Sequence, residues 1–486
     1  MVDKVVKNPT YFEHIRHFFD AADLDHMQRK GIDLSTYESL KTHAMQVLFQ
    51  TEPPNANMPP EKERQWSKQR WETFKNWIIT GHPLGVPKPS KATRSTPDRL
   101  RRDLDSLDAD EIKKLTKAFE GIMALDRNDP SSYFALAGIH WYPDKSRCQH
   151  RVDKYHPWHR AYMLMFENAL RTIEGCEDIT LPYWDVTKPP PDFLFKKPFS
   201  KYRFPISVSP DPAHQAGKDT IRNSRAVIIK ELADYQVSDF IAEGLTKAVW
   251  NDFNNYRGRT VVGAHDAAHA AMAQFNSDVA SFDPIFWFFH SYWDKLWWDW
   301  QQAMGATDYW GFRSTIQGST LFLDPGFDTL EPFPETVRQV IDSHDLGDGG
   351  VGYDTLADAT PEAFTAMIVG STRAINKMHV GRSGRASIRV KNINRLNIPG
   401  GFDVLLKADR KVIGRRFLFQ SSNPNECETC KATALVDLDF ETPVDSIIGK
   451  ELSVELHVRE TPDRLDTRFP LHSAGDPTIN VRLLMD

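Results

Sequence analysis

The chain has 486 residues, of which 40% are hydrophobic and 26% charged, a composition typical of globular proteins and not of disordered or fibrous ones. At roughly 150 residues per domain, this length predicts about three domains. The net charge of −6 provides no general field for phosphate backbones or anionic lipid, so we expect neither nucleic acid nor a membrane as a partner.

The chain also lacks the signals of membrane insertion and export. No apolar run approaches the roughly 18 residues that a spanning helix needs, and no apolar segment follows the N-terminal Met-Val-Asp-Lys. Four cysteines are too few for a disulfide scaffold. We therefore expect a soluble, cytoplasmic protein in a reducing compartment.

Residues 1–85 predict a small N-terminal helical module. Apolar residues recur at helical spacing from Tyr37 to Leu48 and from Trp66 to Ile78, separated by a Pro-rich stretch at 52–60. The following segment, VPKPSKATRSTPDR at 86–99, contains three prolines and four basic residues and almost no apolar side chain. This composition predicts a linker and a domain boundary.

Residues 100–380 are predicted to form the central domain, because most histidines and tryptophans lie there. Its helical core is predicted from amphipathic stretches at 109–125, 158–174, 264–275 and 284–304. The charged run RRDLDSLDADEIKK at 101–114 is most simply a solvated helix face.

Residues 381–486 show a different pattern and predict an all-β domain. Short runs rich in β-branched and aromatic residues are separated by Gly, Asn, Asp and Pro. The runs lie at 386–390, 402–406, 434–440, 452–458 and 479–484.

The central domain concentrates its histidines in three places. Four fall in the stretch 140–159, two are spaced i, i+4 in the sequence HDAAH, and one lies in an aromatic helix that opens at Pro284. They are His140, His150, His156 and His159, then His265 and His269, then His290.

This pattern favours a metal site. Imidazole is a common metal ligand, and two rings one turn apart on a helix can bind the same ion. The HDAAH pair lacks the glutamate of HExxH, which argues against zinc peptidase chemistry. Six imidazoles on apolar helices without interleaved carboxylates favour copper over calcium, magnesium or a di-iron site. A structural helical protein with incidental histidines is the alternative.

The order of the motifs resembles the type-3 copper family of tyrosinases, catechol oxidases and molluscan-type haemocyanin units. His140, then C-x-H at 148–150 and WHR at 158–160, is similar to the first copper motif, and LPYWD at 181–185 is similar to the segment that follows it. HxxxH at 265–269, DPIF at 283–286, His290 and D-x-x-W at 294–297 are similar to the second motif.

The resemblance implies two copper ions with three histidines each. The first set is His140, His150 and His159, and the second is His265, His269 and His290. It also implies a thioether bond between Cys148 and His150, with a small buried hydrophobic role for Cys148 as the alternative. His156 is not among the six implied ligands, and we expect it either to lie next to them or to stand at the start of a helix. Trp158, Phe286, Trp287 and Phe288 are candidates for the apolar shell, or ordinary core.

The implied fold is an α+β multidomain protein. It has an N-terminal helical module at 1–85, a linker at 86–99, a dicopper domain on a four-helix bundle at 100–380, and a β-sandwich at 381–486 that either shields the copper site or only supports the bundle. The implied activity is oxidation of o-diphenols to o-quinones by dioxygen, with o-hydroxylation of monophenols as an extension. The alternative is a reversible dioxygen carrier of the haemocyanin type, and a single unit without a tandem copy favours the enzyme.

The sequence departs from the family pattern around the second copper motif. Phe289 stands where many members have histidine, and Asp266 stands where monophenol-hydroxylating members often have Asn. No Glu occurs between Trp250 and His265 to hold a water. Asp266 is therefore a candidate catalytic residue, holding a water or acting as a base toward phenol. A helix N-terminal Asp that faces the dipole is the alternative.

A C-x-x-C motif at Cys427 and Cys430 lies between two predicted strands. It is consistent with a Cu(I) relay pair, a local disulfide, half of a zinc site or a structural turn.

Overall fold

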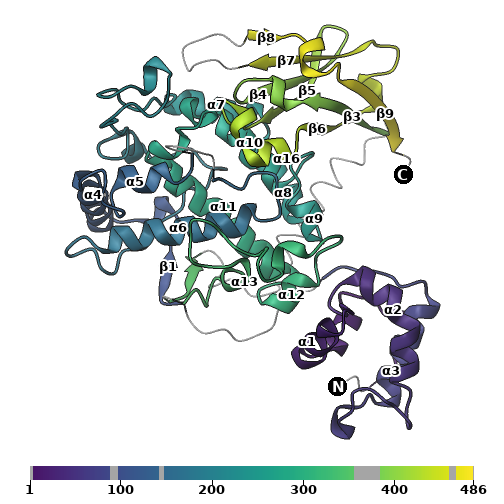
Figure 1. Cartoon of the computed structure of the whole chain (residues 1–486). Helices are drawn as coiled ribbons and strands as arrows, with labels where there is room; N and C mark the ends of the chain where they lie inside the picture. The colour runs from purple at the N-terminus through teal and green to yellow at the C-terminus, as the bar shows by residue number, and fades with distance from the viewer. Residues whose placement is uncertain are drawn as a thin grey trace.

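The computed structural model describes residues 4–87, 97–141, 147–347, 349–354, 384–458 and 467–484. Helices make up the N-terminal and central parts, and two antiparallel sheets make up the C-terminal part (Figure 1). The expected combination of helices and strands is therefore confirmed. No helix in these ranges is both long and apolar enough to cross a lipid bilayer.

The N-terminal part folds as three helices around a hydrophobic core of its own, which includes Phe74 and Trp77. The helices are α1 (Ala21–Arg29), α2 (Tyr37–Gln50) and α3 (Lys68–Ile79). They begin where the sequence offers caps, since the side chains of Asp20 and Ser67 accept hydrogen bonds from main-chain N–H groups in the first turns of α1 and α3. An ion pair between Asp33 and Arg313 joins this part to the central helices.

The central part is organised around α11, whose side chains are buried along almost its whole length. Such a helix requires apolar partners on every side, and α6 and α10 are among them. The helices are α4 (Ala109–Ala124), α5 (Tyr133–Gly138), α6 (Tyr155–Arg171), α7 (Arg225–Asp234), α8 (Val237–Leu245), α9 (Trp250–Phe253), α10 (Val261–Ala270), α11 (Ile285–Met304), α12 (Tyr309–Arg313) and α13 (Val337–Val340).

Two sequence expectations near residue 100 are wrong. Arg99, assigned to the linker, and Arg101, assigned to a solvated helix face, belong to strand β1 (Arg99–Arg101), which pairs in parallel with β2 (Val351–Tyr353). Both arginines are buried because they bind Glu167 of α6, and Arg101 also binds Asp294 of α11. Buried charges are tolerated when they are paired in this way. Arg99 and Arg101 therefore tie these helices together, whereas residues 108–114 of the charged run form the expected solvated start of α4.

The C-terminal strands form two sheets that share one core. The three-stranded sheet has the order β6-β3-β9 and the four-stranded sheet the order β5-β4-β7-β8. In β3, buried residues alternate with more exposed ones, as a strand with one covered face requires. The strands are β3 (Arg385–Asn394), β4 (Phe402–Ala408), β5 (Lys411–Leu418), β6 (Leu435–Pro443), β7 (Leu452–Val458), β8 (Thr467–Phe469) and β9 (Thr478–Leu484).

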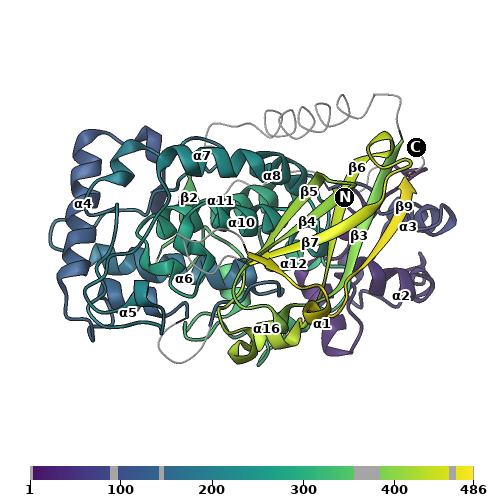
Figure 2. The ribbon, with the colours of Figure 1, turned by 90° about the horizontal axis from the view of Figure 1, so that it is seen from above.

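Strand β5 connects the sheets to the helical part. The sequence analysis missed this strand, because KVIGRRFL carries basic residues and a glycine. It packs against α10, and Figure 2 shows the sheets lying alongside α10 and α8. The segment that follows β5 therefore lies close to α10, the helix that contains the HDAAH sequence.

Candidate metal centre

Three central helices and one connecting segment bring the predicted histidines together. His159 lies on α6, His265 and His269 on α10, and His290 on α11. His140 and His150 lie between α5 and α6. The six histidines are buried in two groups, His140, His150 and His159 with Cys148, and His265, His269 and His290. Within each group, one possible ligand atom per residue lies within 4.8 Å of the others.

The two groups face each other. The rings of His159 and His290 stack with their centroids 4.6 Å apart, and those of His150 and His265 are 5.3 Å apart. Within the second group, the Nε2 atoms of His265 and His269 are separated by 2.9 Å. This arrangement can hold two ions next to each other.

Hydrogen bonds fix the orientation of three of the rings. The Nδ1 atom of His159 lies 2.8 Å from the carbonyl oxygen of Tyr155, and that of His269 lies 2.9 Å from the carbonyl of Phe275. The Nδ1 atom of His265 lies 3.1 Å from Oδ1 of Asp266. A ring that donates from Nδ1 presents an unprotonated Nε2, which is the form that binds a metal.

The remaining three rings have no hydrogen-bond partners among the described residues. Both nitrogens of His140, His150 and His290 are buried and unsatisfied. Leaving a buried polar atom without a partner is unfavourable, so each such atom calls for an explanation. Burial lowers the pKa of these three histidines well below its usual value, and it lowers the pKa of His159 to about 4 and of His269 to about 3. Neutral nitrogen donors without partners fit a pair of copper ions.

Cys148 is a free, buried cysteine within the first group. Its Sγ atom lies 3.5 Å from Nε2 of His159 and within 4.8 Å of the nearest ligand atoms of His140 and His150. The sulfur is thus close to a histidine ring, as a cysteine–histidine thioether requires.

Asp266 lies in the second turn of α10, which begins at Val261, so it is not the N-terminal Asp that the sequence analysis offered as an alternative. Its Oδ1 atom contacts Nδ1 of His265, and its Oδ2 atom accepts a hydrogen bond of 2.7 Å from Nη2 of Arg151. Burial raises the pKa of Asp266, and the neighbouring Arg151 opposes this rise. Both carboxylate oxygens are therefore engaged by protein groups.

Phe419, in the segment after β5, covers the two groups. Its side chain is 0% exposed, and its ring centroid lies 4.2 Å from that of His269, 4.8 Å from that of His150 and 5.0 Å from that of Trp141. Its main-chain carbonyl accepts a hydrogen bond from Nη2 of Arg151. No sequence motif marks Phe419, so sequence analysis missed it.

The apolar shell differs in part from the expectation. Trp158 contacts His159, and Phe286 contacts His290 and His140. Trp287, by contrast, stacks on Phe166, while Phe288 packs against Phe119 and Phe199 in the core. The sequence analysis missed further rings that contact the histidines, among them Trp141, Tyr155, Phe275 and Phe289.

His156 does not join either group. It lies in the first turn of α6, where its ring stacks on Phe253 and contacts Trp297. The expectation of a residue at a helix start is confirmed.

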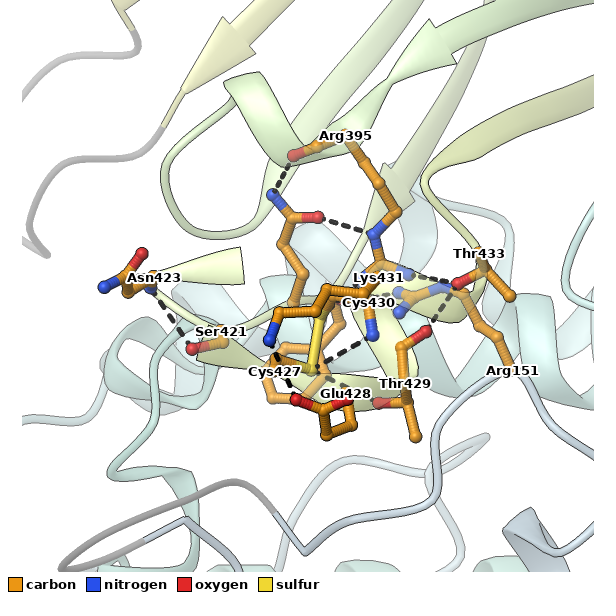
Figure 3. Close-up of a disulfide and its surroundings, with 12 residues drawn as sticks. Arg151, Arg395, Ser421, Asn423, Cys427, Glu428, Thr429, Cys430, Lys431 and Thr433 are labelled. Carbon is orange, nitrogen blue, oxygen red and sulfur yellow. Dashed lines mark hydrogen bonds and ion pairs between the residues drawn. A yellow bond between two sulfur atoms is a disulfide. The ribbon is translucent and has the colours of Figure 1, made fainter. Parts of the chain in front are cut away.

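The C-x-x-C motif forms a disulfide between Cys427 and Cys430 at the short helix α16 (Glu428–Ala432), one of the alternatives left open (Figure 3). Arg395 donates from Nη2 to Sγ of Cys430 at 3.1 Å, and from Nε to Oε1 of Gln420 at 2.8 Å. Gln420 is the neighbour of Phe419, so the disulfide helps to position the segment that covers the histidines.

Comparison with known proteins gives a consistent result. Residues 130–303 match the model of the common central domain of tyrosinase. Tyrosinase of Streptomyces glaucescens is 28% identical over 240 residues, which cover 43% of this chain and 85% of that protein. A G-type hemocyanin of Enteroctopus dofleini is also 28% identical, over 229 residues that cover 42% of this chain and 8% of that much longer protein.

Solved structures show the same fold. Tyrosinase from Burkholderia thailandensis superposes with a TM-score of 0.59 at 19% identity, covering 80% of this chain and all of that one. A functional unit of octopus hemocyanin superposes with a TM-score of 0.55 at 17% identity, covering 79% of this chain and 99% of that one. The family resemblance seen in the sequence is confirmed.

Proposed function

We propose that this chain is a dicopper protein of the type-3 copper family and an oxidase that converts o-diphenols to o-quinones with dioxygen. One observation carries the proposal: two groups of three buried, neutral histidines face each other, and six ring nitrogens have no partner among the described residues. We propose o-hydroxylation of monophenols as an additional activity of the same site.

We assign the first ion to His140, His150 and His159 and the second to His265, His269 and His290. Copper bound there supplies the electrons for reducing dioxygen, because neutral nitrogen ligands in an apolar cage tolerate both Cu(I) and Cu(II). The protein contributes the spacing, the fixed ring orientations and the exclusion of water. A thioether between Cys148 and His150, the partner expected from the sequence, would restrict the His150 ring further.

We infer that Asp266 acts as a positioning residue. Its two oxygens are bound to His265 and Arg151 in the form of the site that Phe419 covers. In this covered form, neither oxygen is free to accept a proton from a phenol. A carboxylate that accepts from Nδ1 holds a ligand ring in one tautomer and raises its basicity. Asp266 therefore serves the second ion through His265.

Access is the second element of the proposal. Phe419, which we call the plug, occupies the space above His269 and His150 where the ring of a phenol would have to lie. It belongs to the β-rich part of the chain and supplies no reacting group. We infer a latent enzyme whose β-rich part shields the metal centre.

The plug also gives the alternative function a specific basis. A covered dicopper site admits dioxygen more readily than a phenol, which is what a dioxygen carrier needs, and an octopus hemocyanin unit shares the fold. The deciding experiment loads the full chain and a Phe419→Ala variant with copper, adds 4-tert-butylcatechol and follows quinone absorbance. Quinone formation by the variant supports the oxidase. Reversible dioxygen binding without quinone in both proteins would support the carrier.

A further inference from the structure

Arg151 lies where the plug meets the metal centre. Its side chain is 1% exposed, and its Nη2 atom donates both to Oδ2 of Asp266 and to the main-chain carbonyl of Phe419. Its Nε–H group is buried and has no acceptor in the described part of the chain. On the edge formed by Nε and Nη2, Nη2 is shared between Asp266 and the Phe419 carbonyl, and Nε is left without an acceptor among the residues described.

The main chain at Arg151 is strained. Its φ angle of +61° lies in the left-handed region, which is unfavourable for a non-glycine residue with a long side chain. Such conformations persist where the surrounding structure enforces them, and they are frequent at active sites. Here the strained residue directly follows the candidate ligand His150, and it directs a cation to the position of the plug carbonyl.

The plug has the covalent skeleton of a small ligand. From the ring that stacks on His269, two carbon atoms lead to the carbonyl that Arg151 binds. A phenol that carries a carboxylate at the end of a two-carbon chain has the same spacing between ring and oxygen. If such a phenol takes the place of both the plug ring and the plug carbonyl when the segment at residue 419 moves away, its carboxylate reaches the guanidinium.

We propose that Arg151 is a specificity-determining residue that selects phenols with a carboxylate on such a chain, for example 3-(3,4-dihydroxyphenyl)propionate. The inference rests on the proposed function, because that function supplies the assumption that the substrate contains a phenol ring. A carboxylate binds a guanidinium more strongly than a neutral carbonyl does, and its two oxygens can use Nε and Nη2 together. Asp266 remains bound to Arg151 and opposes a second anion, so Asp266→Asn should strengthen the preference for the acid.

Binding to copper-free protein tests the inference without any turnover. The full chain with Phe419→Ala is titrated by calorimetry with 3-phenylpropionate and with its neutral match, 3-phenylpropanamide. We expect the acid to bind at least about tenfold more tightly. Adding Arg151→Gln should abolish this ratio, and Arg151→Lys should restore part of it. Equal binding of acid and amide, or an unchanged ratio in Arg151→Gln, would overturn the inference. Phe419→Leu is the second background if the alanine variant does not fold.

Kinetics on the copper-loaded variant separate this inference from the proposed function. The pair is 3-(3,4-dihydroxyphenyl)propionate and 4-ethylcatechol, and the expected advantage of the acid lies in KM and depends on Arg151. If both catechols are oxidised with the same KM, and the acid and the amide bind equally in calorimetry, the proposed oxidase activity is supported and the role of Arg151 is refuted. If neither catechol is oxidised but the acid still binds more tightly than the amide in calorimetry, the proposed oxidase activity is refuted and the anion site at Arg151 is supported.

Discussion

Removal of the plug ring by Phe419→Ala should activate the enzyme. The ring is fully buried and contacts His269, His150 and Trp141. Replacing a buried phenylalanine with alanine typically costs about 3–5 kcal/mol. These contacts exist only in the closed state, in which the β-rich part packs on the metal centre and Phe419 covers the histidines. The substitution therefore destabilises the closed state relative to an open state in which the β-rich part has moved away.

A loss of this size changes access by a large factor. At about 1.4 kcal/mol per tenfold change, it lowers the ratio of closed to open forms by roughly 10²- to 4 × 10³-fold. The apparent affinity for a bulky diphenol scales with the open fraction. The value of kcat/KM for 4-tert-butylcatechol should therefore rise by up to this factor, until the open form predominates.

Phe417→Ala is the matched control. Phe417 is also a buried ring of β5 and lies near Tyr235 of the helical part, so its loss loosens the same interface but leaves the plug ring in place. Both substitutions weaken the closed form, but only Phe419→Ala also removes the ring that blocks the site within that form. At equal copper content, we therefore expect a larger gain for Phe419→Ala than for Phe417→Ala. No gain for Phe419→Ala, or equal gains for both variants, would refute the reasoning that the ring itself blocks the site.

Three further predictions concern the ligands, the cysteine and the pH. His269→Ala or His290→Ala should lose the second copper by metal analysis and nearly all oxidase activity, whereas His156→Ala should retain both ions; full copper content in His290→Ala would contradict the assignment. A thioether removes two hydrogens from the mass of the peptide with Cys148 and protects it from alkylation in the denatured, copper-loaded protein, while Cys176 serves as the internal control that alkylates fully. Burial raises the pKa of Asp278 from 3.8 to about 6, while hydrogen bonds from Ser421 and Ser422 oppose this rise. Opening of the β-rich part uncovers Asp278, so the closed form binds its proton more tightly, and the advantage of the closed form falls by at most about 3 kcal/mol as the pH rises from about 4 to 6. The gain from Phe419→Ala should thus shrink over this pH range as the parent chain opens, and Asp278→Asn should remove this pH dependence.

The sequence predicts the ligands better than it predicts their cover. Helices α6, α10 and α11 show clear periodicity, and the spacing of His265 and His269 places both rings on one helical face. These are local relations that a single segment encodes. Strand β1 escaped prediction because its arginines become buried only through Glu167 and Asp294, far along the chain. The sequence at 345–360, rich in Gly and Asp, predicts a poorly protected main chain that is open to proteolysis. Residues 351–353 instead form the buried strand β2, and residues 348 and 355–360 lie outside the described ranges.

The position of the plug depends on how two separately encoded cores meet. Asp403 of β4 is buried and accepts hydrogen bonds from the hydroxyl of Tyr235, at the end of α7, and from Nε of Arg415 on β5. These bonds hold β5 against the helical part several residues before Phe419, so they set how far the plug reaches toward His269. A substitution at Asp403 would leave all six histidines intact and still change access, because it would remove the acceptor of the Tyr235 hydroxyl and leave Arg415 paired, among the described residues, only with the more distant Glu231. We therefore expect access to depend on this interface, whereas the six histidines are placed by α6, α10, α11 and the segment between α5 and α6.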